Sequence, residues 1–244
     1  MDADRAIRVA TAIGDAAGAE GVPVGIRHVC LACAAMVGDC GVGLSVISDL
    51  GLGEPLYTTD SATEQVMELQ VTLGEGPATV VLMEGRPVLV PDLANNACLR
   101  RWPAFAPAAV VAGTSAIFAF PLVLGAIAVG ALEIHRGQVG SLSPAELVDA
   151  LLFADAATAR VLDRLAGDGE VDAATVTDGL EYRWAQVHQA TGIVSVQLGT
   201  TLIEALLRLR AHAFLTGRRL SLVAHDVLTG ELRLASATDD QNQG

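Results

Sequence analysis

The spacing of apolar residues in the first sixty positions predicts two helices followed by a hairpin. Apolar residues recur every three or four positions over residues 6–17 and again over 23–38, which is the period of an amphipathic helix. Over Gly41–Ser48 apolar residues alternate with small or polar ones, as in a half-buried strand. After a loop, Pro55–Thr59 is the expected hairpin partner.

The middle of the chain continues with short elements separated by glycine-rich turns. A helix is expected to begin at Ser61, and Gly74–Pro77 forms a turn before a short helix over Ala78–Glu84. Residues 92–102 show no clear period and are expected to be irregular. Two further elements complete this region, a strand over Pro87–Val90 and a helix over Ala104–Ala112.

Two long apolar segments, Ser115–Val123 and Ile127–His135, predict a pair of buried strands. Ser143 and Glu146 then have the spacing of a capping box, and Pro144 suits the first helical position, so a helix is expected over Pro144–Leu165.

The helix Pro144–Leu165 has two apolar faces, of which one can cover the sheet and the other can meet a second copy of the chain. A homodimer through this helix is therefore expected. A charged residue in place of Ala154 or Val161 should weaken that dimer. The four-three face consists of Leu147, Leu151, Ala154, Thr158, Val161 and Leu165, and the other of Val148, Leu152 and Ala156.

These elements predict an α+β fold with a mostly antiparallel sheet flanked by helices, followed by a small all-α domain of three helices. The first domain is expected to span residues 1–165, a linker 166–179, the helical domain 180–235, and a frayed tail 236–244. In the helical domain, Thr201 and Glu204 form a second capping box, Gly217 ends a helix, and Ser221 is placed to cap the last one.

The charge-free segment Val110–Leu132 is long enough to span a membrane. Pro121 and several glycines interrupt it, and no cluster of basic residues flanks it, so two buried strands explain it better. With no signal peptide at the start, we expect a cytoplasmic protein that does not contact a membrane.

Charge is distributed unevenly along the chain, whose formal net charge is −13. Residues 180–234 carry six arginines against four acidic residues, a net charge of +2, whereas residues 1–179 carry a net charge of −13. The helical domain is therefore locally basic on an acidic protein, which is compatible with an anionic partner for that domain alone.

The four cysteines are expected to be reduced and structural. Cys30 and Cys33 have the spacing of a metal or redox pair, but they lie inside an apolar helical segment, where burial is the more frequent role. No metal site is predicted, and no catalytic triad, phosphate loop or paired-carboxylate motif is present, so we do not expect an enzyme.

Several motifs in the first domain resemble the GAF family as it occurs in actinobacteria, and the C-terminal motifs resemble the ANTAR domain, an RNA-binding antiterminator module. The first set is LGEGP, GRPVLVPDL, RWPAF, AIFAFPL and GALEIHRGQVGSLSP; the second is QATGIVSVQLG, EALLRLRAHAF and RRLSLVAHDV. The resemblance implies a regulator that senses a signal through the GAF domain. Its ANTAR domain would bind stem-loops in nascent RNA, typically as a dimer, and prevent transcription termination.

The residues expected to bind RNA are basic, polar or small, because RNA is contacted through phosphates and loop bases rather than through its closed major groove. Small side chains at Ala190 and Gly192 would let RNA approach closely, although they could equally serve helix packing, and the arginines could be a solvated face. Thr191 replaces a lysine found in many relatives. The full set is Gln189, Ala190, Thr191, Gly192, Arg208, Arg210, His212, Arg218 and Arg219.

No ligand or cofactor of the first domain can be named from the sequence. Cys40, Cys98 and His135 could line a cavity, and His135 could in principle bind haem, although a single histidine at a strand end is more often a surface or hydrogen-bonded residue. The alternative to RNA binding is a small-molecule or redox sensor whose C-terminal helices bind a protein partner.

Overall fold

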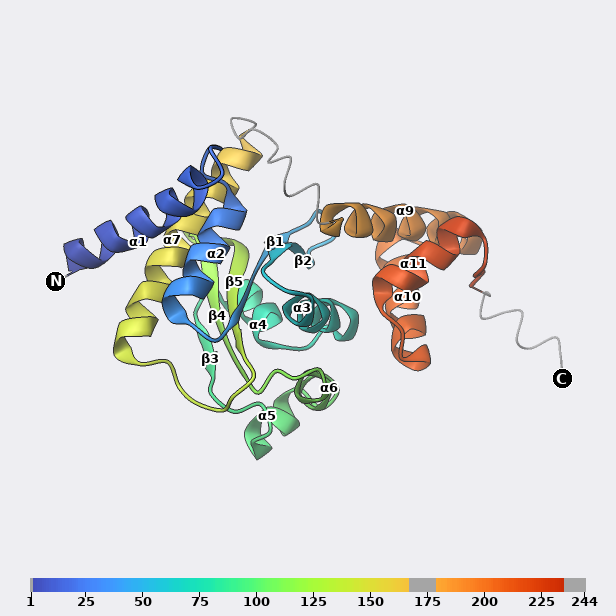
Figure 1. Ribbon diagram of the computed structural model, residues 1–244. Coiled ribbons are helices and arrows are strands. Elements are labelled where there is room, and N and C mark those ends of the chain that lie inside the picture. Colours follow the sequence, from blue (N-terminus) through green and yellow to red (C-terminus); the bar gives the residue numbers. More distant parts are fainter. Residues whose placement is uncertain (1, 167–178, 235–244) are drawn as a thin grey trace, which may run out of the picture. The chain divides into compact units, whose positions relative to one another are not determined.

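The computed structural model describes residues 2–166 and 179–234 and divides the chain into two compact units, Met1–Asp178 and Gly179–Gly244. Figure 1 shows both units, which are described separately below. The predicted linker over 166–179 and the predicted tail over 236–244 lie almost wholly outside the described residues.

Five strands in the described part of the first unit form one antiparallel sheet in the order β2-β1-β5-β4-β3. The expected antiparallel sheet is therefore confirmed, and the tight turn between the two long strands uses Gly125 at φ 63°. The strands are β1 (Gly41–Ile47), β2 (Gly53–Thr58), β3 (Val88–Val90), β4 (Ala116–Leu124) and β5 (Ile127–Arg136).

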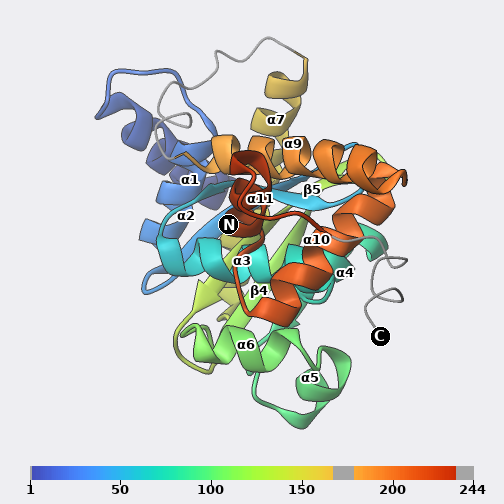
Figure 2. The same cartoon turned by 90° about the vertical axis from the view of Figure 1, so that its right-hand side faces the viewer.

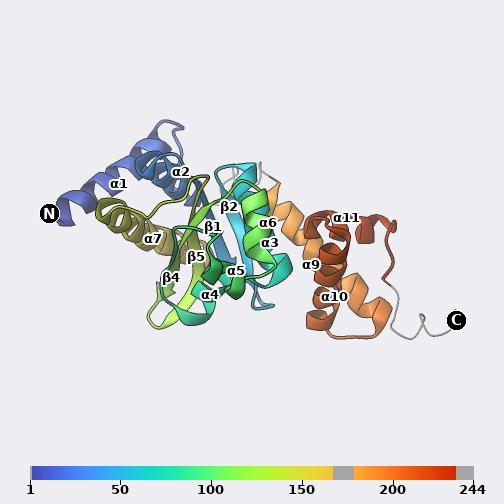
Figure 3. The same ribbon diagram turned by 90° about the horizontal axis from the view of Figure 1, so that it is seen from below.

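Helices cover both faces of the sheet, as Figure 3 shows. One face carries α1 (Asp2–Gly18), α2 (Ile26–Val37) and α7 (Pro144–Leu165), and the other carries α3 (Ser61–Leu73), α4 (Pro77–Glu84), α5 (Asn96–Arg101) and α6 (Phe105–Val111). Alternation along β4 separates the two cores: Phe118 and Phe120 pack under α2 and α7, whereas Ile117 and Ala119 pack under the α3–α6 layer.

Helix α3 lies directly against β1 because two strand positions have no side chain. A Cβ at Gly41 would stand 1.9 Å from the Oγ1 atom of Thr63, and one at Gly43 would stand 2.1 Å from the Sδ atom of Met67. The α3 side chains therefore occupy the space that strand side chains would otherwise fill.

Helix α7 begins at the predicted capping box, in which Ser143 and Glu146 bond to each other's backbone N–H groups. The prediction that its four-three face meets a second copy is wrong for two residues of that face. Ala154 is 4% exposed and Val161 is 1% exposed, because both pack in the core of their own unit. A charge at either position would therefore unfold the unit rather than report on dimerisation.

Residues 92–102, expected to be irregular, contain the short helix α5. The side-chain oxygen of Asn95 accepts hydrogen bonds from the backbone N–H groups of Ala97 and Cys98, which starts this helix. Its six residues are too few to show the apolar period of a helix, so in the sequence only the capping residue Asn95 indicates that a helix begins here.

The second unit consists of α9 (Leu180–Leu198), α10 (Leu202–Thr216) and α11 (Leu220–Thr229) in its described part, best seen in Figure 2. The capping box of Thr201 and Glu204 is present, and Gly217 ends α10 with φ 63°. Ser221 does not cap α11, because the helix begins one residue earlier and Ser221 is buried within it.

No single helix in the described residues is long and apolar enough to cross a membrane. The pair α9 and α10 passes the same length and composition test together, but the two helices are bent by 106° at the break between them.

Candidate functional site

A buried polar cluster lies between the sheet and α3. Gln70 donates a hydrogen bond from Nε2 to the Oε2 atom of Glu133 at 2.5 Å and accepts one at Oε1 from the backbone N–H of Ala78 at 2.8 Å. The Nε2 atom of His135 lies 3.4 Å from the same carboxylate oxygen. All three side chains are nearly inaccessible, so this face of the sheet holds a buried carboxylate.

Neither ring nitrogen of His135 forms a hydrogen bond with a described residue. The residue is 4% exposed, so bulk solvent does not reach the ring. His135 is therefore neither at the surface nor hydrogen-bonded to a described residue, which were its two expected roles, and it lies beside the Gln70–Glu133 pair.

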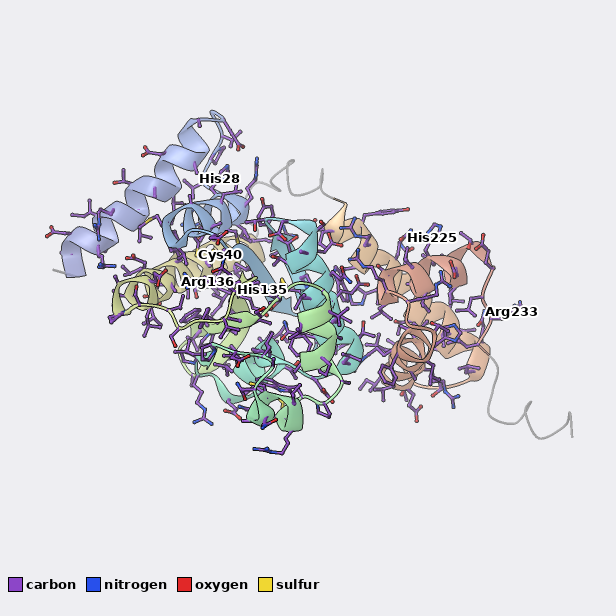
Figure 4. The ribbon with its side chains drawn as sticks, turned by 60° about the horizontal axis from the view of Figure 1, so that its bottom comes forward. His28, Cys40, His135, Arg136, His225 and Arg233 are labelled. Atoms are coloured by element: carbon purple, nitrogen blue, oxygen red, sulfur yellow. The ribbon has the colours of Figure 1, made fainter. Side chains whose placement is uncertain are left out.

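The three residues expected to line one cavity do not lie together. Cys40 packs with the α2–α7 core. His135 pairs with Gly41, the residue after Cys40, but its side chain is on the opposite face of the sheet, beside Glu133. Figure 4 labels Cys40, His135 and Arg136 at this end of the sheet. Cys98 packs in the α3–α6 layer, where its Sγ atom accepts a hydrogen bond from Asn95 at 3.3 Å. A shared site of Cys40, Cys98 and His135 is therefore excluded.

Burial makes three cysteine thiols of the first unit, those of Cys30, Cys33 and Cys40, poor nucleophiles. It raises the pKa of Cys30 and of Cys33 well above the usual range, and both residues are fully buried. Burial also raises the pKa of Cys40 to about 11, although Arg136 nearby acts in the opposite direction. A thiol reacts as its thiolate, so this arrangement does not favour redox chemistry at the Cys30–Cys33 pair.

We expect a thiol reagent at pH 8 to label Cys98 first, Cys40 slowly, and Cys30 and Cys33 only after unfolding. The expected order follows from the burial and the raised pKa of the last three thiols. Mass spectrometry of the labelled peptides over time measures it, with Cys98→Ser as the control that removes the fast phase. Rapid labelling of Cys30 or Cys33 in folded protein would contradict the structural role.

In the second unit, two of the residues expected to bind RNA lie in one open groove of about 640 Å³. We call it the α9 groove; its lining residues are Gln189, Gly192, Ile193, Val196, Gln197 and Leu228. A Cβ built on Gly192 would meet no atom within 4 Å, so the packing of the chain does not require glycine at this position. The groove combines two side-chain amides with apolar walls and contains no charged residue.

Two other residues of the predicted set are buried. Ala190 is fully buried in the core of the helices, and Thr191 is 1% exposed, with its hydroxyl donating to the backbone carbonyl of Val187 at 2.7 Å. The prediction that these side chains contact RNA is therefore wrong. Residues 190 and 191 fall on the inner face of α9, where a small side chain permits close helix packing.

The cationic residues that were predicted to bind RNA differ in their exposure and in their ion pairs. Arg208 is exposed on α10, whereas Arg210 is partly buried, which lowers the pKa of its guanidinium. Arg218 forms an ion pair with Asp226 at 2.5 Å; this hydrogen bond raises the pKa of Arg218 and lowers that of Asp226. The two remaining residues are both partly exposed, His212 on α10 and Arg219 at the N-cap position of α11.

Solved structures resemble the chain in fold. A GAF domain from an Acinetobacter phosphoenolpyruvate-protein phosphotransferase is 14% identical, with a TM-score of 0.50 over 69% of this chain and 98% of that one. The first unit has a GAF-like fold. The corresponding domain from Coxiella burnetii is 14% identical, with a TM-score of 0.49 over 67% of this chain and 99% of that one. No family model and no curated protein matches the sequence.

One member of the polar cluster in the GAF-like unit, Glu133, has a signal in the sequence. Glu133 follows immediately after the long charge-free segment, and a carboxylate at a buried strand position needs a partner. The LGEGP motif has a structural role, since the carboxylate of Glu75 accepts hydrogen bonds from the backbone N–H groups of Ala104 and Phe105 at the start of α6. No local pattern marks the role of Gln70, because its carboxylate partner Glu133 is 63 residues away.

Proposed function

We propose that the protein is a cytoplasmic, signal-responsive regulator without enzymatic activity. Its GAF-like unit senses a signal, and its second unit binds stem-loops in nascent RNA and so promotes transcription antitermination. The GAF-like fold supports the sensing role, and the resemblance of the C-terminal motifs to ANTAR domains supports the RNA-binding role.

The observation that carries the RNA proposal is the α9 groove. RNA loops are recognised through unstacked bases, whose faces pack on apolar surfaces and whose edges form hydrogen bonds. Gln189 and Gln197 provide amide donors and acceptors, and Ile193, Val196 and Leu228 provide apolar walls. A glycine in the middle of a helix destabilises it by about 0.5–1 kcal/mol relative to alanine, so an open Gly192 is best explained by a partner that approaches the helix backbone.

Phosphate contacts would come from the exposed arginines. The local charge of +2 is small for a nucleic-acid-binding domain, and the pairing of Arg218 with Asp226 reduces it further. Two units acting together would double the number of phosphates contacted and of counterions released. A dimer is therefore part of the proposal, formed through the exposed side of α7, where Leu151 and Leu165 are 42% and 70% exposed.

Replacing Arg208 by alanine is expected to weaken RNA binding about three- to tenfold for every hairpin sequence and to reduce the salt dependence by about one counterion. Crosslinking to cellular RNA followed by sequencing identifies the hairpins, and filter binding over a salt series measures both effects. Arg8→Ala, at an exposed position of α1, is the matched control and should bind like the wild type.

A protein partner for the second unit is the competing function, and the apolar lining of the α9 groove is the observation that favours it. The same experiment separates the two functions. If no RNA is recovered by crosslinking, or if the affinity does not depend on salt, the RNA proposal fails and the partner is a protein.

A further inference from the structure

A polar pocket of about 420 Å³ lies at one end of the sheet, where α2 and β5 end and α7 begins. We call it the Arg136 pocket; its side-chain lining includes Val37, Asp39, Arg136, Gln138, Val139 and Glu146. Figure 4 labels Arg136 and also Cys40, the residue after Asp39. The lining contains no residue of the Gln70–Glu133 cluster, so this pocket is a separate feature of the GAF-like unit.

The guanidinium of Arg136 has hydrogen-bond donors to spare. The side chain is 17% exposed, and its guanidinium lies 5.8 Å from the centroid of the Phe118 ring, which holds it in place. Its Nη2 atom donates to the Oε1 atom of Glu146 at 2.5 Å. A guanidinium has five N–H donors, so most of them have no partner among the described residues. These donors can pair with the carboxylate of a ligand while Glu146 stays bound.

Asp39 adds a carboxylate that forms no ion pair with a described residue. It follows Gly38, at which α2 ends with a hydrogen bond from the Gly38 N–H to the carbonyl of Ala34. The partial negative charge at the C-terminus of a helix acts in the same direction as the carboxylate. This part of the pocket therefore favours a cationic group.

The charges of the Arg136 pocket disfavour simpler classes of ligand. One positive and two negative side chains give the lining a net charge of −1, which repels a dianion such as phosphate. A divalent cation would face the guanidinium, and the described residues contain no group of three side chains that could hold a metal ion. A neutral ligand would displace water from these charges without pairing them.

We propose that the Arg136 pocket binds a small zwitterion, namely a free α-amino acid with an apolar side chain. The carboxylate of the amino acid pairs with Arg136, its ammonium group pairs with Asp39, and its side chain contacts the valines of the lining, Val37 and Val139. None of the described lining residues is aromatic, so the pocket does not suit a quaternary ammonium compound, which binds aromatic faces.

The amino acid is the signal of the regulator only if the proposed function holds, whereas its binding is measured without RNA. Arg136 at the end of β5 and Glu146 in the first turn of α7 both line the pocket, so binding acts on the start of α7. An amino acid that binds but does not change RNA affinity would support the site and remove it from the control of RNA binding.

Thermal-shift measurements of the full chain with each standard amino acid, followed by calorimetry, test the site. Leucine and valine are expected to bind more tightly than aspartate and glutamate, whose second carboxylate would meet the acidic residues of the lining, Asp39 and Glu146. For the amino acid that binds best, two analogues separate the contributions of its charged groups. The analogue without the ammonium group and the analogue without the carboxylate should each bind at least about threefold more weakly.

Two substitutions locate the binding in the Arg136 pocket. Asp39→Asn should weaken amino-acid binding about two- to fivefold and strengthen binding of the analogue without the ammonium group. Asparagine tolerates the backbone φ of 45° at this position, so only the charge is removed. Arg136→Lys keeps the charge but loses the planar fork, and should weaken amino-acid binding about tenfold. Asp49→Asn, at an exposed position between β1 and β2, is the matched control and should bind like the wild type.

Three results would overturn the proposal. The first is a full chain that binds none of the standard amino acids, and the second is an analogue without the ammonium group that binds as tightly as the amino acid. The third is unchanged affinity of both Asp39→Asn and Arg136→Lys, which would place the bound amino acid elsewhere. Weaker binding by these two variants, with normal binding by Asp49→Asn, would support the site.

Discussion

Replacing Gln70 by leucine is expected to lower the free energy of unfolding of the GAF-like unit by about 3–5 kcal/mol. The substitution leaves the buried carboxylate of Glu133 without its hydrogen-bond donor and the backbone N–H of Ala78 without its acceptor. An unsatisfied buried polar group costs about 1–3 kcal/mol, and a charged one costs more. Urea unfolding measures the change, with Trp102 reporting on this unit once Trp184 of the second unit is replaced by phenylalanine.

Two further variants establish that the polar cluster causes the loss. Gln65→Leu, at an exposed position of the same helix, should change stability by less than about 0.5 kcal/mol. Adding Glu133→Leu to Gln70→Leu should restore part of the stability, because no carboxylate then remains buried without a donor. A Gln70→Leu variant as stable as the wild type would show that the pair is not structural.

The order of elements in the GAF-like unit could be predicted because each strong signal is local. The capping box at Ser143 and the two apolar segments that became β4 and β5 depend on neighbours in the chain. The position of α3 on β1 could not be predicted, because it depends on the absence of side chains at Gly41 and Gly43 opposite Thr63 and Met67. Such contacts between distant segments have no period or motif.

The predicted site residues were harder to place for the same reason. The apolar period predicted two faces for α7, but three of the five residues that α7 buries, Ala150, Phe153 and Ala157, belong to neither predicted face. In α9, residues 189–192 form one sequence motif, but each residue of a helix is rotated by about 100° from the one before it. Ala190 and Thr191 therefore face the core of the unit, whereas Gln189 and Gly192 line the α9 groove. The motif therefore identified the helix, and only the packing separated its inner side chains from its outer ones.

Replacing Gly192 by alanine is expected to raise the stability of the second unit and to lower its affinity for RNA. The added methyl group meets no atom of the chain, so removing a glycine from the interior of α9 should stabilise the unit by about 0.5–1 kcal/mol. The same methyl group occupies the floor of the α9 groove, where an RNA base would approach the helix backbone. We expect the RNA affinity to fall at least about tenfold, which corresponds to about 1.4 kcal/mol.

Gly14→Ala is the matched control for this prediction. Gly14 is also a helix-interior glycine with no atom within 4 Å of the added Cβ, but it lies in α1 of the GAF-like unit. Alanine there should raise stability by a similar amount and leave RNA binding unchanged. Thermal unfolding and filter binding on both variants measure the two quantities. A more stable variant is not less folded, so weaker RNA binding by Gly192→Ala, with normal binding by Gly14→Ala, would show that RNA binds in the α9 groove. Unchanged RNA binding by Gly192→Ala would show that the α9 groove is not part of the RNA site.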